Sequence, residues 1–250
     1  MRIDLNCDLG ESFGAWTMGL DSQVIPFITS ANIACGWHAG DPLVMDATVA
    51  ACKAAGVAVG AHPGFPDLMG FGRRNVAASP QEVRAYVQYQ VGALQAFCAA
   101  HGVVLRHVKP HGALYNMAGK DEALARAIAE GIYAINPALV LLGLAGSKII
   151  EAAAAIGLPF AREIFADRAY EEDGALVARG KPGAMIHDED FAIARVVRMI
   201  KTGTVEAITG KVIQLQADSV CVHGDGPKAL AFVQKIRTAL KSEGVAVQAL

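Results

Sequence analysis

Most side chains that could carry out chemistry fall in six short segments of the sequence, and glycine lies in or near most of these segments. The six segments are Asn6–Glu11, Asn32–Asp41, Gly60–Pro63, Lys109–Tyr115, Glu163–Arg168 and Cys221–Asp225. Together they supply imidazole, carboxylate, lysine and guanidinium groups. This combination suits the hydrolysis of an unreactive carbonyl, in which a base deprotonates water while fixed positive charge stabilises the developing oxyanion.

The side-chain types indicate which residues take part in catalysis and which bind ligands. The predicted catalytic residues are Asp8, His38, His62, Lys109 and His111. Asp8, His38 and His62 are candidate bases, or groups that orient a base, whereas Lys109 is a candidate cation beside the oxyanion. The predicted substrate- or phosphate-binding residues are Asn6, Glu11, Asn32, Tyr115, Glu163, Asp167, Arg168, His223 and Asp225.

Whether these residues bind a metal stays open at this point. Asp8 could bind a divalent ion together with two histidines of the six segments, and the expected ligands are then Asp8, His38 and His62. However, the sequence contains neither a His-Glu-x-x-His nor a Cys-x-x-Cys spacing. Structural roles also compete with chemical ones: His107 can be a hydrogen-bonded core histidine, and Arg73 and Arg74 can lie on a solvated face or clamp a phosphate.

Short apolar or β-branched runs alternate with alanine-rich helical stretches, which is the pattern of strands and helices around a parallel sheet. Strands are predicted at Arg2–Cys7, Phe27–Cys35, Val57–Ala61, Val104–Val108, Leu139–Leu142, Phe160–Phe165 and Ser219–His223. Helices are predicted at Leu43–Ala55, Pro80–His101, Asp121–Ile135, Ser147–Ile156, Asp188–Thr202 and Pro227–Ser242. The sequence therefore predicts an α/β fold with about seven parallel strands, one fewer than a complete (β/α) barrel.

The predicted strands explain how residues far apart in the sequence can meet. In a parallel barrel the residues just after each strand share one rim, where the active sites of such barrels are built. Two stretches, Pro63–Ala78 and Ala166–Asp190, are too long for tight turns, and loops of that length often cover or bind ligands. No repeat or linker divides the sequence, so residues 1–250 are expected to form a single domain.

Composition excludes several classes of protein. Of the 250 residues, 53% are apolar and 18% are charged, which suits one large core rather than a disordered chain. The net charge of −2 gives no reason to expect a nucleic-acid partner. Charges, glycines and a proline interrupt the longest apolar stretch, so no membrane span is expected. Five cysteines without paired spacing, and an N-terminus without signal-peptide features, predict a cytoplasmic protein.

The six segments, with their neighbours, also resemble a known set of motifs. The matching blocks are Asn6–Gly14 (NCDLGESFG), Ser30–Asp41 (SANIACGWHAGD), Gly60–Asp67 (GAHPGFPD), Val108–Tyr115 (VKPHGALY), Glu163–Arg168 (EIFADR) and Val222–Gly226 (VHGDG). These blocks resemble the motifs of the LamB/YcsF family, in the family's order and over nearly the whole chain. No departure occurs at the polar motif positions.

The resemblance implies both a fold and a reaction. The implied fold is an irregular, TIM-like (β/α) barrel related to the glycoside hydrolase and deacetylase superfamily. The implied reaction is that of 5-oxoprolinase, in which the lactam of 5-oxo-L-proline (pyroglutamate) is opened to L-glutamate while ATP is hydrolysed. The implied partners are two further subunits, B and C, with ATP as co-substrate and Mg²⁺ accompanying it.

Two other classes of function compete with this expectation. The first is a metal-dependent deacetylase or amidohydrolase that acts alone, which the superfamily relationship and the histidines near the rim favour. The second is a non-catalytic subunit whose barrel binds a small molecule, but this class leaves the dense set of polar residues at the strand ends unexplained.

Overall fold

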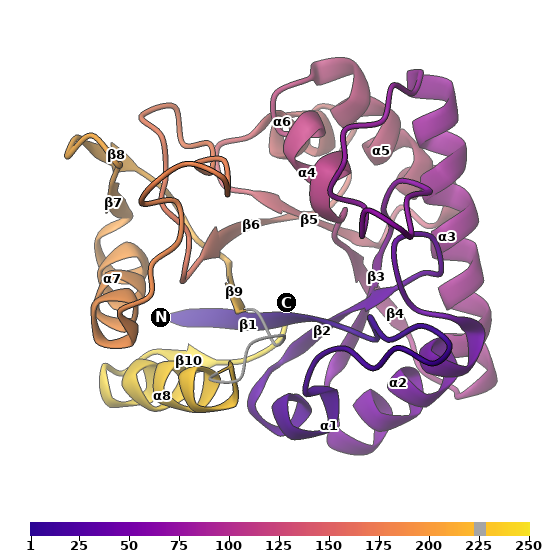
Figure 1. Ribbon diagram of the computed structural model, residues 1–250, viewed down its shortest axis with the longest axis horizontal. Coiled ribbons are helices and arrows are strands. Elements are labelled where there is room, and N and C mark those ends of the chain that lie inside the picture. Colours follow the sequence, from indigo (N-terminus) through magenta and orange to yellow (C-terminus); the bar gives the residue numbers. More distant parts are fainter. Residues whose placement is uncertain (223–228) are drawn as a thin grey trace.

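Among the described residues, 1–222 and 229–250, seven parallel strands form a closed barrel, as this computed structural model shows (Figure 1). The barrel strands are β1 (Arg2–Leu9), β2 (Ser30–Ala34), β3 (Ala58–His62), β4 (Leu105–Val108), β5 (Val140–Leu144), β6 (Phe160–Phe165) and β9 (Ser219–Val222). β1 closes the barrel because it pairs with β2 through Asn6–Leu9 and with β9 through Asp4–Cys7. The predicted parallel barrel of about seven strands is therefore confirmed.

Helices surround the barrel (Figure 1), and the predicted helices are present with ends that differ by one or two residues. The helices are α1 (Asp21–Val24), η1 (Ile25–Phe27), α2 (Pro42–Ala55), α3 (Pro80–Ala100), α4 (Gly112–Ala118), α5 (Glu122–Ile135), α6 (Lys148–Ala155), α7 (Glu189–Thr202) and α8 (Ala229–Ser242). α3 begins where the sequence indicates, because Ser79 and Glu82 form a capping box around its first turn. The predicted start of α8 at Pro227 lies outside the described residues.

Several short elements were not predicted from the sequence. They are α1, η1, α4, the antiparallel hairpin of β7 (Thr204–Glu206) and β8 (Val212–Gln214), and β10 (Ala246–Val247), which pairs with the start of β1. Each is too short to show a helical or strand period in the sequence. In place of an eighth barrel strand, the chain between β6 and β9 forms the irregular stretch 166–188, α7 and the hairpin.

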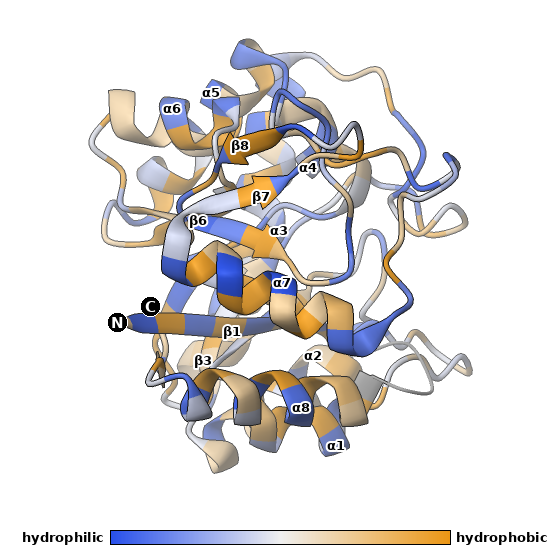
Figure 2. Cartoon of the chain, turned by 90° about the vertical axis from the view of Figure 1, so that its left-hand side faces the viewer, coloured by the Kyte–Doolittle hydropathy of each residue, from blue (hydrophilic) through white to orange (hydrophobic). Residues whose placement is uncertain are grey.

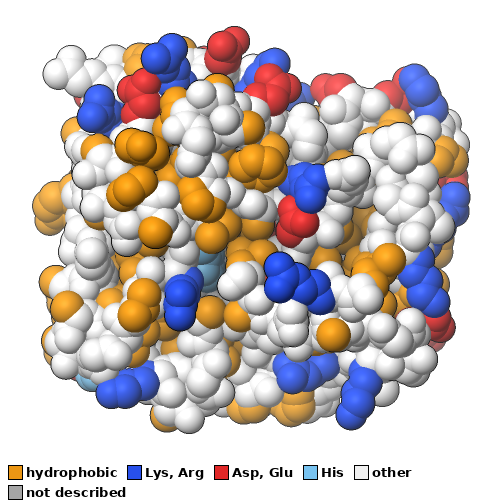
Figure 3. Space-filling view, turned by 180° about the vertical axis from the view of Figure 1, so that it is seen from behind, with side chains coloured by type: hydrophobic (Ala, Val, Ile, Leu, Met, Phe, Trp, Pro, Cys, Tyr) orange, Lys and Arg blue, Asp and Glu red, His pale blue; other side chains and the backbone are white. Residues whose placement is uncertain are grey.

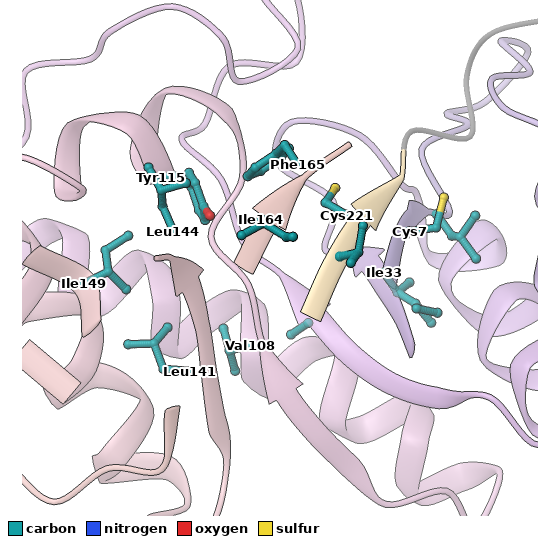
Figure 4. Packing of buried hydrophobic residues seen from close by; sticks show 14 of the residues in the cluster. Cys7, Ile33, Val108, Tyr115, Leu141, Leu144, Ile149, Ile164, Phe165 and Cys221 are labelled. Carbon is teal, nitrogen blue, oxygen red and sulfur yellow. The ribbon is translucent and has the colours of Figure 1, made fainter. Parts of the chain in front are cut away.

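Side chains along each barrel strand alternate between two environments. On β1, Ile3, Leu5 and Cys7 belong to the apolar core, whereas Asn6 and Asp8 form hydrogen bonds with residues of other strands. β6 and β9 lie side by side in Figure 4, with Phe165 paired to Cys221. Helices cover the outer side of the strands, and α7 and α8 show both hydrophobic and hydrophilic residues in Figure 2.

The surface of the molecule carries mixed charge. On the face in Figure 3, Lys, Arg, Asp and Glu side chains are scattered, with hydrophobic side chains between them. This distribution agrees with the small net charge of the sequence. Within residues 1–222 and 229–250, we find no helix with the length and apolar character that crossing a bilayer requires.

Candidate active site at the carboxyl ends of the barrel strands

Polar side chains fill much of the interior of the barrel. At the amino ends of the strands, the carboxylate of Asp4 accepts hydrogen bonds from Ser30 and Ser219. One level higher, the Asn6 amide donates to Ser219 Oγ at 2.7 Å, and Asn32 donates to Asn6 Oδ1 at 2.7 Å. Interiors of parallel barrels are usually packed with branched apolar residues, so this polar interior indicates a function beyond folding.

Gly60 makes room for another polar group at this middle level. The ring of His107 occupies the space that a Cβ at Gly60 would need, and its Nε2 lies 2.7 Å from Asn32 Oδ1. Burial lowers the pKa of His107 to about 3, so the ring is neutral at physiological pH. His107 is therefore a hydrogen-bonded core histidine that holds Asn32, which was one of the two roles considered from the sequence.

Lys109 is the buried cation at the carboxyl ends of the strands. Its Nζ lies 2.9 Å from Asp8 Oδ1 and 2.8 Å from Glu163 Oε1, and it also contacts the Cys221 thiol at 3.2 Å. Burial by itself lowers the pKa of Lys109, but the nearby negative charges, Asp8 foremost, outweigh burial and hold this pKa well above its ordinary value. Lys109 is thus a fixed positive charge at neutral pH.

The two carboxylates beside Lys109 have different surroundings. Glu163 is fully buried, and its Oε2 accepts a hydrogen bond of 2.7 Å from the Tyr115 hydroxyl. Asp8 is partly exposed to the cavity above the barrel, and the Asn32 amide donates to its Oδ1 at 2.8 Å. Asp8 is therefore the carboxylate that a ligand in the cavity can reach.

Asp8 also contacts a group of histidines. Its Oδ2 lies 3.3 Å from His62 Nε2, and the same nitrogen lies 2.9 Å from His111 Nδ1. The other nitrogen of His62 lies 2.7 Å from the main-chain oxygen of Lys109, and that of His111 lies 2.8 Å from the main-chain oxygen of Phe71. Main-chain carbonyls thus hold both rings in place.

Glu11 and His38 complete this group. Glu11 Oε1 lies 3.4 Å from His38 Nε2 and 3.7 Å from His111 Nδ1. The rings of His38 and His111 stack with their centroids 3.6 Å apart and their planes 2° from parallel. Burial holds the pKa of both rings well below the ordinary value, so both are neutral at physiological pH.

Four of these residues could hold a metal ion. The candidate ligand atoms of Glu11, His38, His62 and His111 all lie within 4.8 Å of one another. The set expected from the sequence shares only His38 and His62 with this cluster. Asp8 contacts His62 but is turned toward Lys109 and Asn32, because Oδ1 is bonded to both of those residues.

A cavity of about 540 Å³ opens above the interior network, and Asp8, His62, Lys109 and His111 line it. Three arginines, Arg73, Arg168 and Arg179, contribute to its wall. Arg168 is buried and donates from Nη2 to the main-chain oxygen of Val177 at 2.6 Å. The cavity can therefore receive a small anionic ligand next to Asp8 and Lys109.

The structure brings most of the predicted site residues together, with three exceptions. Among the described residues, Asp167 is not part of the cavity wall, and its main-chain oxygen accepts a hydrogen bond from the Ile186 amide. His223 and Asp225 lie outside the described residues. Of the predicted ligand-binding residues, Asn6, Asn32 and Glu163 lie below the cavity and support Asp8 and Lys109 rather than lining it.

Sequence reasoning missed several residues of the site. Phe71 has a positive φ of 54°, which is unusual for a non-glycine residue, and its carbonyl holds His111. Arg73, considered from the sequence as a solvated residue or a phosphate clamp, is exposed, packs on the Phe71 ring at 5.0 Å and lines the cavity. Asp4 could have been found from the alternation Asp4-x-Asn6-x-Asp8, but nothing in the sequence marks the conformation of Phe71.

The model of the LamB/YcsF family matches residues 3–250 of this sequence. The chain belongs to the LamB/YcsF family. Among its relatives, a protein of Clostridium beijerinckii named as the A subunit of 5-oxoprolinase is 65% identical over 98% of this chain and 96% of that protein. The protein of the same name from Bacillus subtilis is 54% identical over 100% of this chain and 97% of its own length. These names do not favour the alternative of a deacetylase that acts alone.

Solved structures agree with the fold. The "Lactam Utilization Protein" from Thermus thermophilus superposes with a TM-score of 0.94 at 48% identity, over 100% of both chains. A putative cellobiose-phosphate cleavage protein from Enterococcus faecalis has a TM-score of 0.53 at 12% identity, over 98% of this chain and 96% of that one. The second likeness concerns the fold alone.

Proposed function

We propose that this chain is the A subunit of an ATP-dependent 5-oxoprolinase, which opens the lactam of 5-oxo-L-proline to L-glutamate and hydrolyses ATP to ADP and phosphate. Family membership and the names of the relatives support this proposal. The observation that carries the chemistry is the position of Asp8, whose two oxygens contact Lys109 and His62 at the wall of the cavity.

The chemistry explains why ATP is needed. A five-membered lactam is stabilised by resonance, and its carbonyl carbon is a poor electrophile. Transfer of the γ-phosphoryl group to the lactam oxygen makes that carbon electrophilic. Addition of water, loss of a proton to a base and cleavage of the C–N bond with protonation of nitrogen then give γ-glutamyl phosphate, whose hydrolysis releases glutamate and phosphate.

The residues of the cavity suit these steps. Asp8, or His62 next to it, takes the proton of the attacking water. Lys109 places a permanent positive charge beside the developing oxyanion, while Arg168 offsets the charge of the phosphoryl group. His111 Nδ1 lies 2.9 Å from His62 Nε2, so His111 positions His62 rather than donating a proton itself.

The proposal extends to partners and co-substrate. Subunits B and C complete the enzyme, and ATP, accompanied by Mg²⁺, binds within the complex in the cytoplasm. This chain then supplies the lactam-opening cavity, because its charged residues surround a space suited to a small anion.

The decisive experiment measures glutamate released from 5-oxoproline and ATP by this chain alone and with subunits B and C. We expect release only with ATP and both partners. Asp8→Asn is expected to lower kcat by about 100- to 10,000-fold, the usual contribution of a general base. Asp46→Asn, at an exposed carboxylate paired with His101, is the matched control and should keep full activity. Full coupled activity in the Asp8→Asn complex would contradict the proposal.

A further inference from the structure

The histidine cluster brings two ring nitrogens together without an evident proton between them. His62 Nδ1 and His111 Nε2 each face a main-chain carbonyl, and because a carbonyl only accepts, each of these nitrogens carries its proton. In a neutral imidazole the other nitrogen is then a bare lone pair. With both rings neutral, His62 Nε2 and His111 Nδ1 point lone pairs at each other across 2.9 Å.

Negative charge makes the repulsion between these nitrogens stronger. Asp8 Oδ2 lies 3.3 Å from His62 Nε2, and Glu11 Oε1 lies 3.7 Å from His111 Nδ1. Three electron-pair donors, His62 Nε2, His111 Nδ1 and Glu11 Oε1, thus lie close together, and a cation among them removes the repulsion. A metal ion about 2.1 Å from each ligand separates its ligands by about 3.0 to 3.4 Å. This range lies between the 2.9 Å from His62 Nε2 to His111 Nδ1 and the 3.7 Å from Glu11 Oε1 to His111 Nδ1.

Ring orientation decides which histidines can share an ion. An imidazole binds a metal in the plane of its ring. The rings of His62 and His111 are nearly perpendicular, at 88°, so one ion can lie in both planes. The rings of His38 and His111 are parallel and stacked, so an ion in the plane of one is displaced from the other by more than a bond length.

We propose that His62 Nε2, His111 Nδ1 and Glu11 bind one divalent transition-metal ion of the zinc class, with His38 as a positioning residue. His38 Nε2 donates its proton to Glu11 and orients that carboxylate, as groups behind metal ligands commonly do. Two imidazoles and one carboxylate select zinc, cobalt or iron over magnesium, which prefers oxygen ligands. With the ion bound, Asp8 rather than His62 is the base for lactam opening, and the proposal itself does not depend on that reaction.

The test uses the full chain, stripped with a chelator and titrated with Co²⁺, whose visible absorption reports nitrogen and oxygen ligands. We expect one Co²⁺ per chain, which Zn²⁺ displaces and equimolar Mg²⁺ does not. His62→Gln and His111→Gln should each weaken Co²⁺ binding by more than about 100-fold. His38→Phe should still bind one ion with an affinity reduced by about 10- to 100-fold.

Two controls keep this result interpretable. His101→Gln removes a histidine outside the cluster and should bind Co²⁺ as the wild type does. X-ray absorption of the Zn²⁺-loaded wild type needs no variant and should count two imidazoles, not three. Absence of Co²⁺ binding by the wild type would mean that these side chains keep their arrangement without a metal ion. That outcome, wild-type affinity in His62→Gln, or three imidazoles around zinc would each overturn the proposal.

Discussion

The interior of the barrel and the layer between strands and helices are built from the same strands but differ in what holds them together. In the outer layer, apolar residues such as Leu5 and Ile33 pack against helices and are fully buried. In the interior, Asn6 and Asn32 lie beside these residues in the sequence and make directional hydrogen bonds. The outer layer tolerates substitutions that conserve volume, whereas the interior depends on every partner being present.

The two regions together keep charged side chains inside the barrel. A buried Lys109 with two carboxylates is unfavourable unless each charge is compensated. The apolar layer supplies the stability that permits this arrangement, and the interior network supplies the geometry. Substitutions in the two regions are therefore expected to differ in their cost.

Replacing the central cation should have the largest effect. Lys109→Met keeps most of the side-chain volume but leaves Asp8 and the buried Glu163 without their counter-charge, and we expect it to lower the free energy of unfolding by about 3–5 kcal/mol. Urea denaturation of the purified chain measures this loss. Lys148→Met, at an exposed lysine paired with Glu151, is the matched control and should change little. Equal stability of the two variants would mean that the interior charges are not coupled.

Adding one methyl group should have the next largest effect, and this effect should differ between the two regions. In Gly60→Ala the new Cβ would overlap the His107 ring, and we expect a loss of about 1–3 kcal/mol in urea denaturation because the interior cannot shift without breaking hydrogen bonds. Gly92→Ala, on an exposed position of α3, meets no atom of the described chain within 4 Å beyond its own helix. This control should gain about 0.5–1 kcal/mol. If Gly60→Ala left the free energy of unfolding unchanged, the barrel interior would be able to accommodate the added methyl group.

The smallest expected effect is a change in how the free energy of unfolding depends on pH. Burial raises the pKa of Asp4 above 3.8, although hydrogen bonds from Ser219 and Ser30 oppose the shift. The folded state therefore holds the Asp4 proton more tightly, and this stabilisation is complete below pH 3.8 and lost as pH rises through the raised pKa. Relative to wild type, Asp4→Asn should gain about 1.4 kcal/mol per unit of pKa shift across that window. Denaturation midpoints at several pH values measure this gain.

Asp218 lies outside the barrel interior, and its pKa shifts in the opposite direction to that of Asp4. Burial acts to raise its pKa, but hydrogen bonds from Arg162 outweigh burial and lower it. Its stabilisation is present above pH 3.8 and is lost as pH falls through the lowered pKa. Asp218→Asn should therefore lose stability relative to wild type at neutral pH and recover it in acid. If both variants followed the same trend with pH, the interior would not differ from the rest of the protein.

Much of the fold could be predicted from the sequence, because it depends on long periodic segments. Strand and helix positions for the barrel agree within a few residues, and proline and serine at helix starts indicate where α2 and α3 begin. Short elements such as α4 and the β7–β8 hairpin could not be predicted, since their conformation is set by tertiary contacts rather than by local pattern.

The candidate site likewise contains features that could be predicted from the sequence and features that could not. Residues at strand ends, such as Asp8 and Lys109, could be placed near one another because parallel strands share one rim. The individual contacts within the site could not be predicted. The contact of Glu11 with His38 and the stacking of His38 on His111 depend on how loops fold over the rim. Backbone features, including the Phe71 carbonyl that holds His111, leave no mark in residue type.

The closure of the barrel by β1 has a consequence for how the protein is made. Asn6 on the first strand is hydrogen-bonded to Ser219 on the last barrel strand, 213 residues later. A chain emerging from the ribosome cannot form this contact until almost the whole polypeptide has been synthesised, and such distant pairing slows folding. Until β9 has been synthesised, β1 lacks its partner on that side, so neither the barrel nor the candidate site can be complete before residue 222 has been made.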